Sequence, residues 1–124
     1  MTAPRPRAVS LLARATEIVA ALGLEDCLVG ISHECDYPPS VLDRPRASRP
    51  RFEVSGLTSA ELDRAVRRAM ADHGAVYEID AARLAALRPD ILFAQAVCEV
   101  CAVPTASAQA AAAELPGAPR VVSL

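Results

Sequence analysis

The chain has 124 residues, of which 52% are hydrophobic and 23% are charged, and its formal net charge at pH 7 is −2. This composition excludes a disordered protein, and the length is that of one compact domain. The slightly acidic balance provides no basic field to attract nucleic acid or an anionic membrane surface. We therefore predict a single folded domain with no nucleic-acid partner.

The N-terminal segment resembles a secretory signal only superficially. Arg14 and Glu17 divide its apolar stretch into pieces of about six residues, whereas a signal core needs about 7 to 15 uninterrupted apolar residues. A membrane span needs about 20. As written, the chain is predicted to be cytoplasmic, with no membrane span. In that reducing compartment, its four cysteines indicate metal or redox chemistry rather than structural disulfides.

The first third of the chain predicts a strand, a helix and a second strand. The apolar runs at residues 7–12 and 27–31 are typical of buried strands in a parallel sheet. Between them, residues 16–22 form a helical pattern that starts near Thr16 and is closed by Gly23. A strand, a helix and a strand in this order predict a right-handed βαβ unit.

Residues 32–55 are rich in proline and charge and follow neither the helical nor the strand period, which predicts a long irregular loop. Loops of this length in compact domains are usually functional. Pro45 and Pro50 interrupt its basic cluster, so we expect a solvated loop, or a cationic rim that attracts an anionic ligand or partner. The cluster consists of Arg44, Arg46, Arg49 and Arg51.

The remaining residues continue the alternation of helices and strands. Thr58 or Ser59 caps an amphipathic helix to His73, and Asp80 caps a second helix to residue 87. A helix capped by Thr105 runs to residue 115. Strands are expected at residues 77–79, 90–94 and 120–124. The predicted fold is α/β, a three-layer lobe with a mostly parallel sheet flanked by helices.

Two loops carry the candidate binding residues. In an open α/β sheet, ligands bind outside the carboxyl ends of the strands, so the loops after residues 27–31 and 90–94 are the candidates. If these strands run parallel, both loops open on the same edge of the sheet, where their side chains can converge. The ligand-binding candidates are His33, Glu34, Asp36, Tyr37, Gln95 and Glu99.

Four residues of these loops form a candidate metal site for zinc or iron, because thiolate and imidazole are the ligands that these metals accept. They are His33, Cys35, Cys98 and Cys101. Two alternatives stay open: a redox dithiol at Cys98 and Cys101, and buried thiols that pack the loop without an ion. Cys27, at the start of a strand, is expected to be buried as a small hydrophobe.

The charges of the loops favour a cationic ligand. Glu34, Asp36 and Glu99 add negative charge at this edge, which disfavours an anionic ligand. Tyr37, followed by two prolines, presents a rigid aromatic surface that can stack on a flat macrocycle or pack within its own loop. No nucleophile elbow, P-loop or dinucleotide fingerprint is present, and we predict that the chain is not an enzyme.

Two motifs are shared with a known family: Ser-His-Glu-Cys-Asp-Tyr-Pro at residues 32–38 and Cys-Glu-Val-Cys-Ala-Val at residues 98–103. With them, nearly the whole chain resembles the cobalamin and ferric-siderophore (metal-chelate) class of substrate-binding proteins of ABC transporters, in its cobalamin-binding branch. The resemblance implies that residues 1–124 form the N-terminal lobe of a two-lobed protein. The connecting helix and second lobe would then be absent.

The resemblance also implies a ligand and partners. The ligand is cobalamin or another metal chelate, and the partner, if the protein is exported, is an ABC permease on the periplasmic or extracellular side. Ala13 and Arg14 replace the Pro-Ser usual after the first strand. The alternative function is an intracellular metal-thiolate or redox protein that uses the same lobe. Because half of a clamp exposes the face that meets its partner lobe, self-association through that face is also expected.

Overall fold

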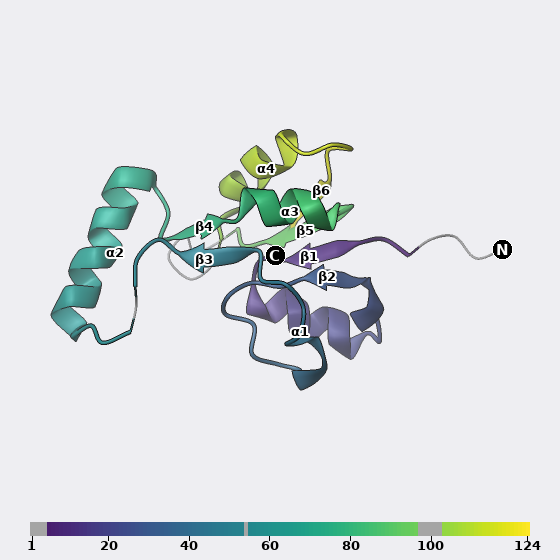
Figure 1. Ribbon diagram of the computed structural model, residues 1–124, viewed down its shortest axis with the longest axis horizontal. Coiled ribbons are helices and arrows are strands. Elements are labelled where there is room, and N and C mark those ends of the chain that lie inside the picture. The colour runs from purple at the N-terminus through teal and green to yellow at the C-terminus, as the bar shows by residue number, and fades with distance from the viewer. Residues whose placement is uncertain (1–4, 54, 97–102) are drawn as a thin grey trace.

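The computed structural model describes residues 5–53, 55–96 and 103–124. In this part of the chain, four parallel strands form a sheet in the order β2-β1-β5-β6, shown in Figure 1. Their bounds are Ala8–Ser10 (β1), Leu28–Gly30 (β2), Ile91–Ala94 (β5) and Arg120–Ser123 (β6). All four lie within the predicted ranges. The predicted α/β fold with a mostly parallel sheet is therefore confirmed.

Helices cover both faces of the sheet, as the three-layer prediction requires. Figure 1 shows α1 (Ala13–Ala21) on one face, with α3 (Ala81–Leu87) and α4 (Thr105–Ala113) on the other. Side chains alternate between the two faces along a strand, so the sheet contributes residues to two cores, one on each face. The core with α3 and α4 includes Val9, Leu11, Leu84, Leu92, Ala94, Ala108 and Ala112, and the core with α1 includes Ala8, Val19, Leu28 and Val41.

Helix α1 begins three residues earlier than predicted. It starts at Ala13, its N-cap is Leu12, and no side chain caps it. The polar residue expected near the start, Thr16, lies inside the helix and is fully buried. Packing of this turn against the interior therefore outweighs the missing cap. The predicted end is confirmed: Gly23 adopts the left-handed conformation with φ +76°, as in the usual glycine-closed helix end.

The predicted loop over residues 32–55 contains a strand, so that part of the prediction is wrong. Strand β3 (Ser48–Pro50) pairs antiparallel with β4 (Tyr77–Ile79), 27 or more residues away in the sequence. Proline is tolerated here because a two-stranded ribbon is all edge. The cross-strand pair Arg49 and Glu78 adds an ion pair of 2.7 Å.

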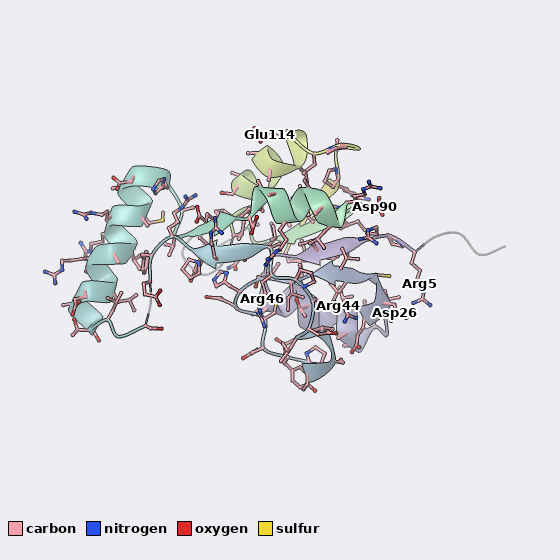
Figure 2. The ribbon with its side chains drawn as sticks, in the orientation of Figure 1. Arg5, Asp26, Arg44, Arg46, Asp90 and Glu114 are labelled. Atoms are coloured by element: carbon pink, nitrogen blue, oxygen red, sulfur yellow. The ribbon has the colours of Figure 1, made fainter. Side chains whose placement is uncertain are left out.

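The arginine cluster does not form a solvated loop or a free cationic rim, which corrects the prediction. Three of the four guanidinium groups donate to main-chain carbonyls at 2.8 to 3.0 Å: Arg44 to Leu28, Arg46 to Ser32 and Cys35, and Arg51 to Ala75. Figure 2 labels Arg44 and Arg46, which lie among the segments beside β2. Main-chain carbonyls in loops and at the edge of a sheet need donors, and these side chains supply them.

Helix α2 (Ser59–His73) matches its prediction but lies apart from the sheet, beyond the β3–β4 ribbon (Figure 1). The Thr58 hydroxyl accepts a hydrogen bond from the Glu61 N–H at 3.2 Å, and Gly74 ends the helix with φ +70°. Ala69 is its one buried residue, and Leu62 of its apolar stripe is 38% exposed. Helix α2 therefore depends on its caps more than on packing.

Of the caps predicted for the other two helices, one is confirmed and one is wrong. Asp80 caps α3 as predicted, since its carboxylate accepts from the Arg83 N–H at 3.0 Å. Thr105 is not a cap but the first residue of α4, because Pro104 occupies the cap position; its hydroxyl lies 2.7 Å from the Ser123 hydroxyl. Among the described residues, no helix is long and apolar enough to cross a membrane.

Removing the cap of α2 is expected to destabilise that helix alone. Thr58→Ala removes the hydroxyl acceptor, which is worth about 1 kcal/mol at a helix N-terminus. Because α2 buries little, we expect faster amide hydrogen exchange in residues 59–73 with an unchanged urea midpoint for the sheet. Ser59→Ala, which leaves the cap in place, is the control. A shift of the global midpoint in Thr58→Ala would show that α2 unfolds together with the sheet.

Candidate functional site

The candidate site is the loop that follows β2, at the carboxyl edge of the parallel sheet. In Figure 1, β1 and β2 point toward the β3–β4 ribbon, which lies beyond this edge. The loop is held both by a backbone bridge and by an arginine side chain. Ile31 continues β2 by a parallel bridge to Arg46, and the Arg46 guanidinium donates to the Ser32 and Cys35 carbonyls. One arginine thus fixes both ends of the turn.

Cys35 lies inside this turn. Its side chain is 2% exposed, and its Sγ lies 3.0 Å from Thr16 Oγ1 and 3.3 Å from Ser32 Oγ. Ser32 Oγ also accepts from the Glu34 N–H at 3.2 Å. The thiol is therefore part of a small buried polar cluster between α1 and the loop. Cys27 is also buried and free, as predicted.

His33 is held at one ring nitrogen and left without a partner at the other. Its Nδ1 lies 2.9 Å from Ser48 Oγ, which also accepts from the His33 backbone N–H at 3.3 Å. The Nε2 atom is buried and has no hydrogen-bond partner within the part of the chain that the structure describes; Glu34 Oε1 is 3.7 Å away. A buried nitrogen without a partner is costly and calls for a physical explanation.

Tyr77 and Glu34 complete the surroundings of His33. The Tyr77 and His33 rings are 4.5 Å apart and inclined at 43°, and the Tyr77 hydroxyl donates to Glu34 Oε1 at 3.0 Å. Burial and the nearby Glu34 carboxylate raise the pKa of Tyr77 to about 12. Tyr77 thus keeps its proton at neutral pH and remains a donor to Glu34.

Ser48 and Tyr77 were not among the predicted site residues. Both belong to the β3–β4 ribbon, and β3 lies within a segment whose prolines and charges predicted a loop. Without that pairing, no spacing rule connects residue 33 with residue 77. Ala47 and Ser48 are both buried and Arg49 is exposed, so no alternation of apolar and polar residues marked this strand in the sequence.

The other predicted residues of the first loop lie in the open. Tyr37 is 59% exposed, and Asp36 is exposed as well. The structure therefore leaves the Tyr37 ring free to contact a ligand rather than packing it into its own loop. Together with Glu34, whose side chain is 44% exposed, these residues form an aromatic and acidic surface beside the sheet edge.

The second loop begins at the same sheet edge. Gln95 pairs with Pro104 by a parallel bridge: the Gln95 N–H donates to the Val103 carbonyl at 3.2 Å, and the Gln95 carbonyl accepts from the Thr105 N–H at 3.1 Å. The ends of this loop are thereby tied together. Cys98, Glu99 and Cys101 lie outside the described residues, so their convergence with His33 and Cys35 stays a prediction.

The metal prediction also stays open. Among residues 5–53, 55–96 and 103–124, no three His, Cys, Asp or Glu side chains are grouped so that they could hold a metal ion. The predicted set of His33, Cys35, Cys98 and Cys101 draws half of its members from outside this part of the chain. Within it, His33 Nε2 is the one buried side-chain nitrogen or oxygen atom without a hydrogen-bond partner.

Two hollows of the described surface lie away from these loops. One measures about 730 Å³ and lies between α2 and residues 51–53 and 57, lined by both basic and acidic side chains. A second hollow of about 480 Å³ lies between β4, α3 and α4. Neither is lined by a predicted site residue. Because the first reflects the detachment of α2, size alone does not identify the binding surface.

His33 gives the ligand-free chain a pH-dependent stability. Burial lowers the pKa of His33 from 6.5, Glu34 opposes this shift and Arg46 adds to it. The unfolded chain therefore takes up the proton at a higher pH than the folded chain. The contribution of the neutral ring is complete above pH 6.5 and is lost as the pH falls from there through the lowered pKa.

We expect His33→Gln to lose less stability than the unchanged chain between about pH 7.5 and about pH 5. Urea unfolding at the two pH values measures this difference. His73→Gln is the matched control, because His73 is exposed at the end of α2. If His33→Gln kept the full loss on acidification, carboxylates elsewhere would be its source.

Comparison with known proteins gives a consistent result. No family model matches the chain. Over 45 residues it is 47% identical to the vitamin B12-binding protein of Vibrio cholerae serotype O1, in each of three strains, a match that covers 36% of this chain and 16% of the relative. Over this segment the chain is homologous to a vitamin B12-binding protein. The predicted resemblance is thereby confirmed.

Two solved structures share the fold. The periplasmic vitamin B12 binding protein BtuF of Vibrio cholerae matches with a TM-score of 0.58 and 24% identity, over 97% of this chain and 35% of that chain. The periplasmic heme-binding protein RhuT from Roseiflexus sp. RS-1, in apo form, matches with 0.58 and 23%, over 97% and 34%. The chain spans about a third of either. These relatives are binding proteins, which agrees with the prediction that the chain is not an enzyme.

Proposed function

We propose that the chain is the N-terminal, ligand-binding lobe of a two-lobed substrate-binding protein for cobalamin or a related metal chelate. The observation that carries this proposal is the 47% identity over 45 residues with a vitamin B12-binding protein. The match of nearly the whole chain to about a third of two periplasmic binding proteins supports a lobe. Residues 1–124 then correspond to one side of a ligand cleft.

The chemistry of the loop after β2 favours a corrinoid over a heme. A flat macrocycle can stack on the exposed ring of Tyr37. Glu34 and Asp36 can accept hydrogen bonds from amide side chains, which a corrinoid carries around its ring. The same carboxylates repel the propionates of a heme, and repulsion of this kind separates similar ligands. The acidic edge thus selects between the two ligands named for the relatives.

The residues at this edge also fit a metal-containing ligand. A buried imidazole nitrogen without a partner, His33 Nε2, is a group that a metal ion can satisfy. Gln95, at the start of the second loop, adds an amide that can both donate and accept. When bound, the chelate supplies a metal centre; the chain supplies an aromatic surface, acceptors and one imidazole.

The partners and location follow from the same proposal. A substrate-binding protein acts on the outer side of a membrane and delivers its ligand to an ABC permease, so we propose a periplasmic or extracellular role and a permease partner. We also propose that the sheet edge meets a second lobe or, in this chain alone, a second copy. Size-exclusion chromatography with light scattering tests whether two copies associate. A monomer at all concentrations would rule out self-association.

Equilibrium dialysis against hydroxocobalamin and against hemin tests the ligand. We expect retention of hydroxocobalamin and weaker retention of hemin. Tyr37→Ala is expected to weaken binding of hydroxocobalamin about tenfold, since one aromatic contact is worth about 1 kcal/mol or more, while Tyr37→Phe keeps the ring and serves as control. Near-stoichiometric zinc or iron in the purified chain, without corrinoid binding, would instead favour an intracellular metal-thiolate protein.

A further inference from the structure

We propose that His33 ligates the metal of the bound chelate through Nε2, and that the Glu34 and Tyr77 side chains cover this atom in the ligand-free chain. The inference rests on the proposed function, because it takes a metal chelate as the ligand. It names a first contact between this lobe and the metal itself, rather than with the rim of the macrocycle.

The first support is the way in which the ring is held. Ser48 Oγ lies 2.9 Å from Nδ1 and fixes the ring from the side of β3. A histidine that binds a metal through one nitrogen usually makes a hydrogen bond through the other. The serine hydroxyl oxygen has two acceptor lone pairs, so Ser48 Oγ can accept hydrogen bonds both from Nδ1–H and from the His33 backbone N–H. The lone pair is then on Nε2.

The second support is the state of Nε2 itself. This atom is buried and has no hydrogen-bond partner among the described residues, although nearly all buried polar atoms in folded proteins have one. The Glu34 Oε1 atom is 3.7 Å away, beyond hydrogen-bonding distance.

The third support is that the cover is held by few contacts. Glu34 is half-exposed, and one hydrogen bond of 3.0 Å from the Tyr77 hydroxyl holds its carboxylate near His33. Rotation of the Glu34 side chain away from Tyr77 breaks that bond and leaves the ring of His33 to the ligand. Once rotated, the Glu34 carboxylate can accept a hydrogen bond from an amide side chain of a corrinoid.

The competing explanation is structural: Glu34 shifts slightly and accepts a hydrogen bond from Nε2–H, so that Tyr77, Glu34, His33 and Ser48 form one chain that only stiffens the loop. The two explanations differ in an observable way. Ligation places a histidine nitrogen on the metal, whereas the hydrogen-bonded chain leaves the metal with no protein nitrogen.

The test uses the unchanged chain with cob(II)alamin, produced once with natural and once with ¹⁵N-labelled histidine. Electron paramagnetic resonance of the bound cobalt reports its axial nitrogen. We expect three-line splitting with natural histidine to become two-line splitting with ¹⁵N-histidine. Three-line splitting in both samples would overturn the inference. The chain has two histidines, and His73→Gln is expected to keep the two-line pattern; its loss there would assign the nitrogen to His73 and also overturn the inference.

Two further measurements separate this inference from the proposed function. Equilibrium dialysis of the same samples shows whether cobalamin is retained at all. Retention with no histidine nitrogen on cobalt overturns the ligation alone, whereas no retention overturns the proposed function and the ligation with it. Tyr77→Phe, which removes the hydrogen bond that holds the Glu34 carboxylate near His33 and keeps the carboxylate itself, is expected to keep the two-line pattern and to bind cobalamin faster in stopped-flow absorbance. A slower or unchanged rate would overturn the covering role of Glu34.

Discussion

Arg46→Ala is expected to destabilise the chain by about 3 kcal/mol, because hydrogen bonds from a charged group to buried acceptors are worth about 1.5 to 3 kcal/mol. One Nη1 donates to the carbonyls of both Ser32 and Cys35, at 2.8 and 3.0 Å. Without it, the Cys35 carbonyl loses this donor, the Ser32 carbonyl retains the longer hydrogen bond from the Cys35 N–H at 3.3 Å, and the turn that carries His33 loses its support. We expect a lower urea midpoint and at least tenfold weaker cobalamin retention.

Arg49→Ala is the matched control for this change. Arg49 lies three residues further along the chain, in β3, but it is exposed and forms an ion pair with Glu78 on the surface, where such pairs contribute little. We expect its urea midpoint and its cobalamin retention to match those of the unchanged chain. Equal urea midpoints for Arg46→Ala and Arg49→Ala would show that the turn holds its shape without the guanidinium group.

Leu92→Ala is expected to cost about 3 kcal/mol or more of unfolding free energy, since removal of a fully buried leucine leaves a cavity. Leu92 is 0% exposed and lies in β5, the strand between β1 and β6. For a domain of this size, the loss corresponds to a fall of about 10 °C in Tm. Thermal unfolding followed by circular dichroism measures it.

The control for Leu92→Ala is the same chemical change on the detached helix. Leu62 in α2 is 38% exposed, so Leu62→Ala removes the same atoms but leaves no buried cavity. We expect its Tm to stay within about 2 °C of that of the unchanged chain, as for most surface substitutions. A Leu62→Ala effect as large as that of Leu92→Ala would mean that α2 packs on the sheet in solution.

Much of the fold could be predicted because its elements are specified locally. Apolar runs predicted β1, β2, β5 and β6, and the capping residues Thr58 and Asp80 predicted where α2 and α3 begin. Short parallel strands are buried on both faces, so they read as continuous apolar segments. Helix α1 was placed one turn too late because a buried turn without a cap leaves no signal in the sequence.

Part of the candidate site could also be predicted from the sequence, and part could not. Its position after β2, its acidic and aromatic residues and its homology to vitamin B12-binding proteins were readable from the sequence, because motif residues lie side by side along the chain. The partners of His33 were not readable. Ser48 and Tyr77 reach it only when β3 pairs with β4, and Arg46 supports the turn only when its guanidinium meets two loop carbonyls.

The sequence by itself therefore determined the α/β class, the positions of the sheet strands along the chain and the loop on which binding is expected. Only the tertiary structure decided that the arginines support the loop, that Cys35 is buried beside Thr16 and Ser32, and that His33 Nε2 has no partner among residues 5–53, 55–96 and 103–124. The physical reason is that hydrophobic periodicity and capping act over a few residues. The hydrogen bonds around the site join residues that are mostly 11 to 43 positions apart, and no local pattern specifies such pairs.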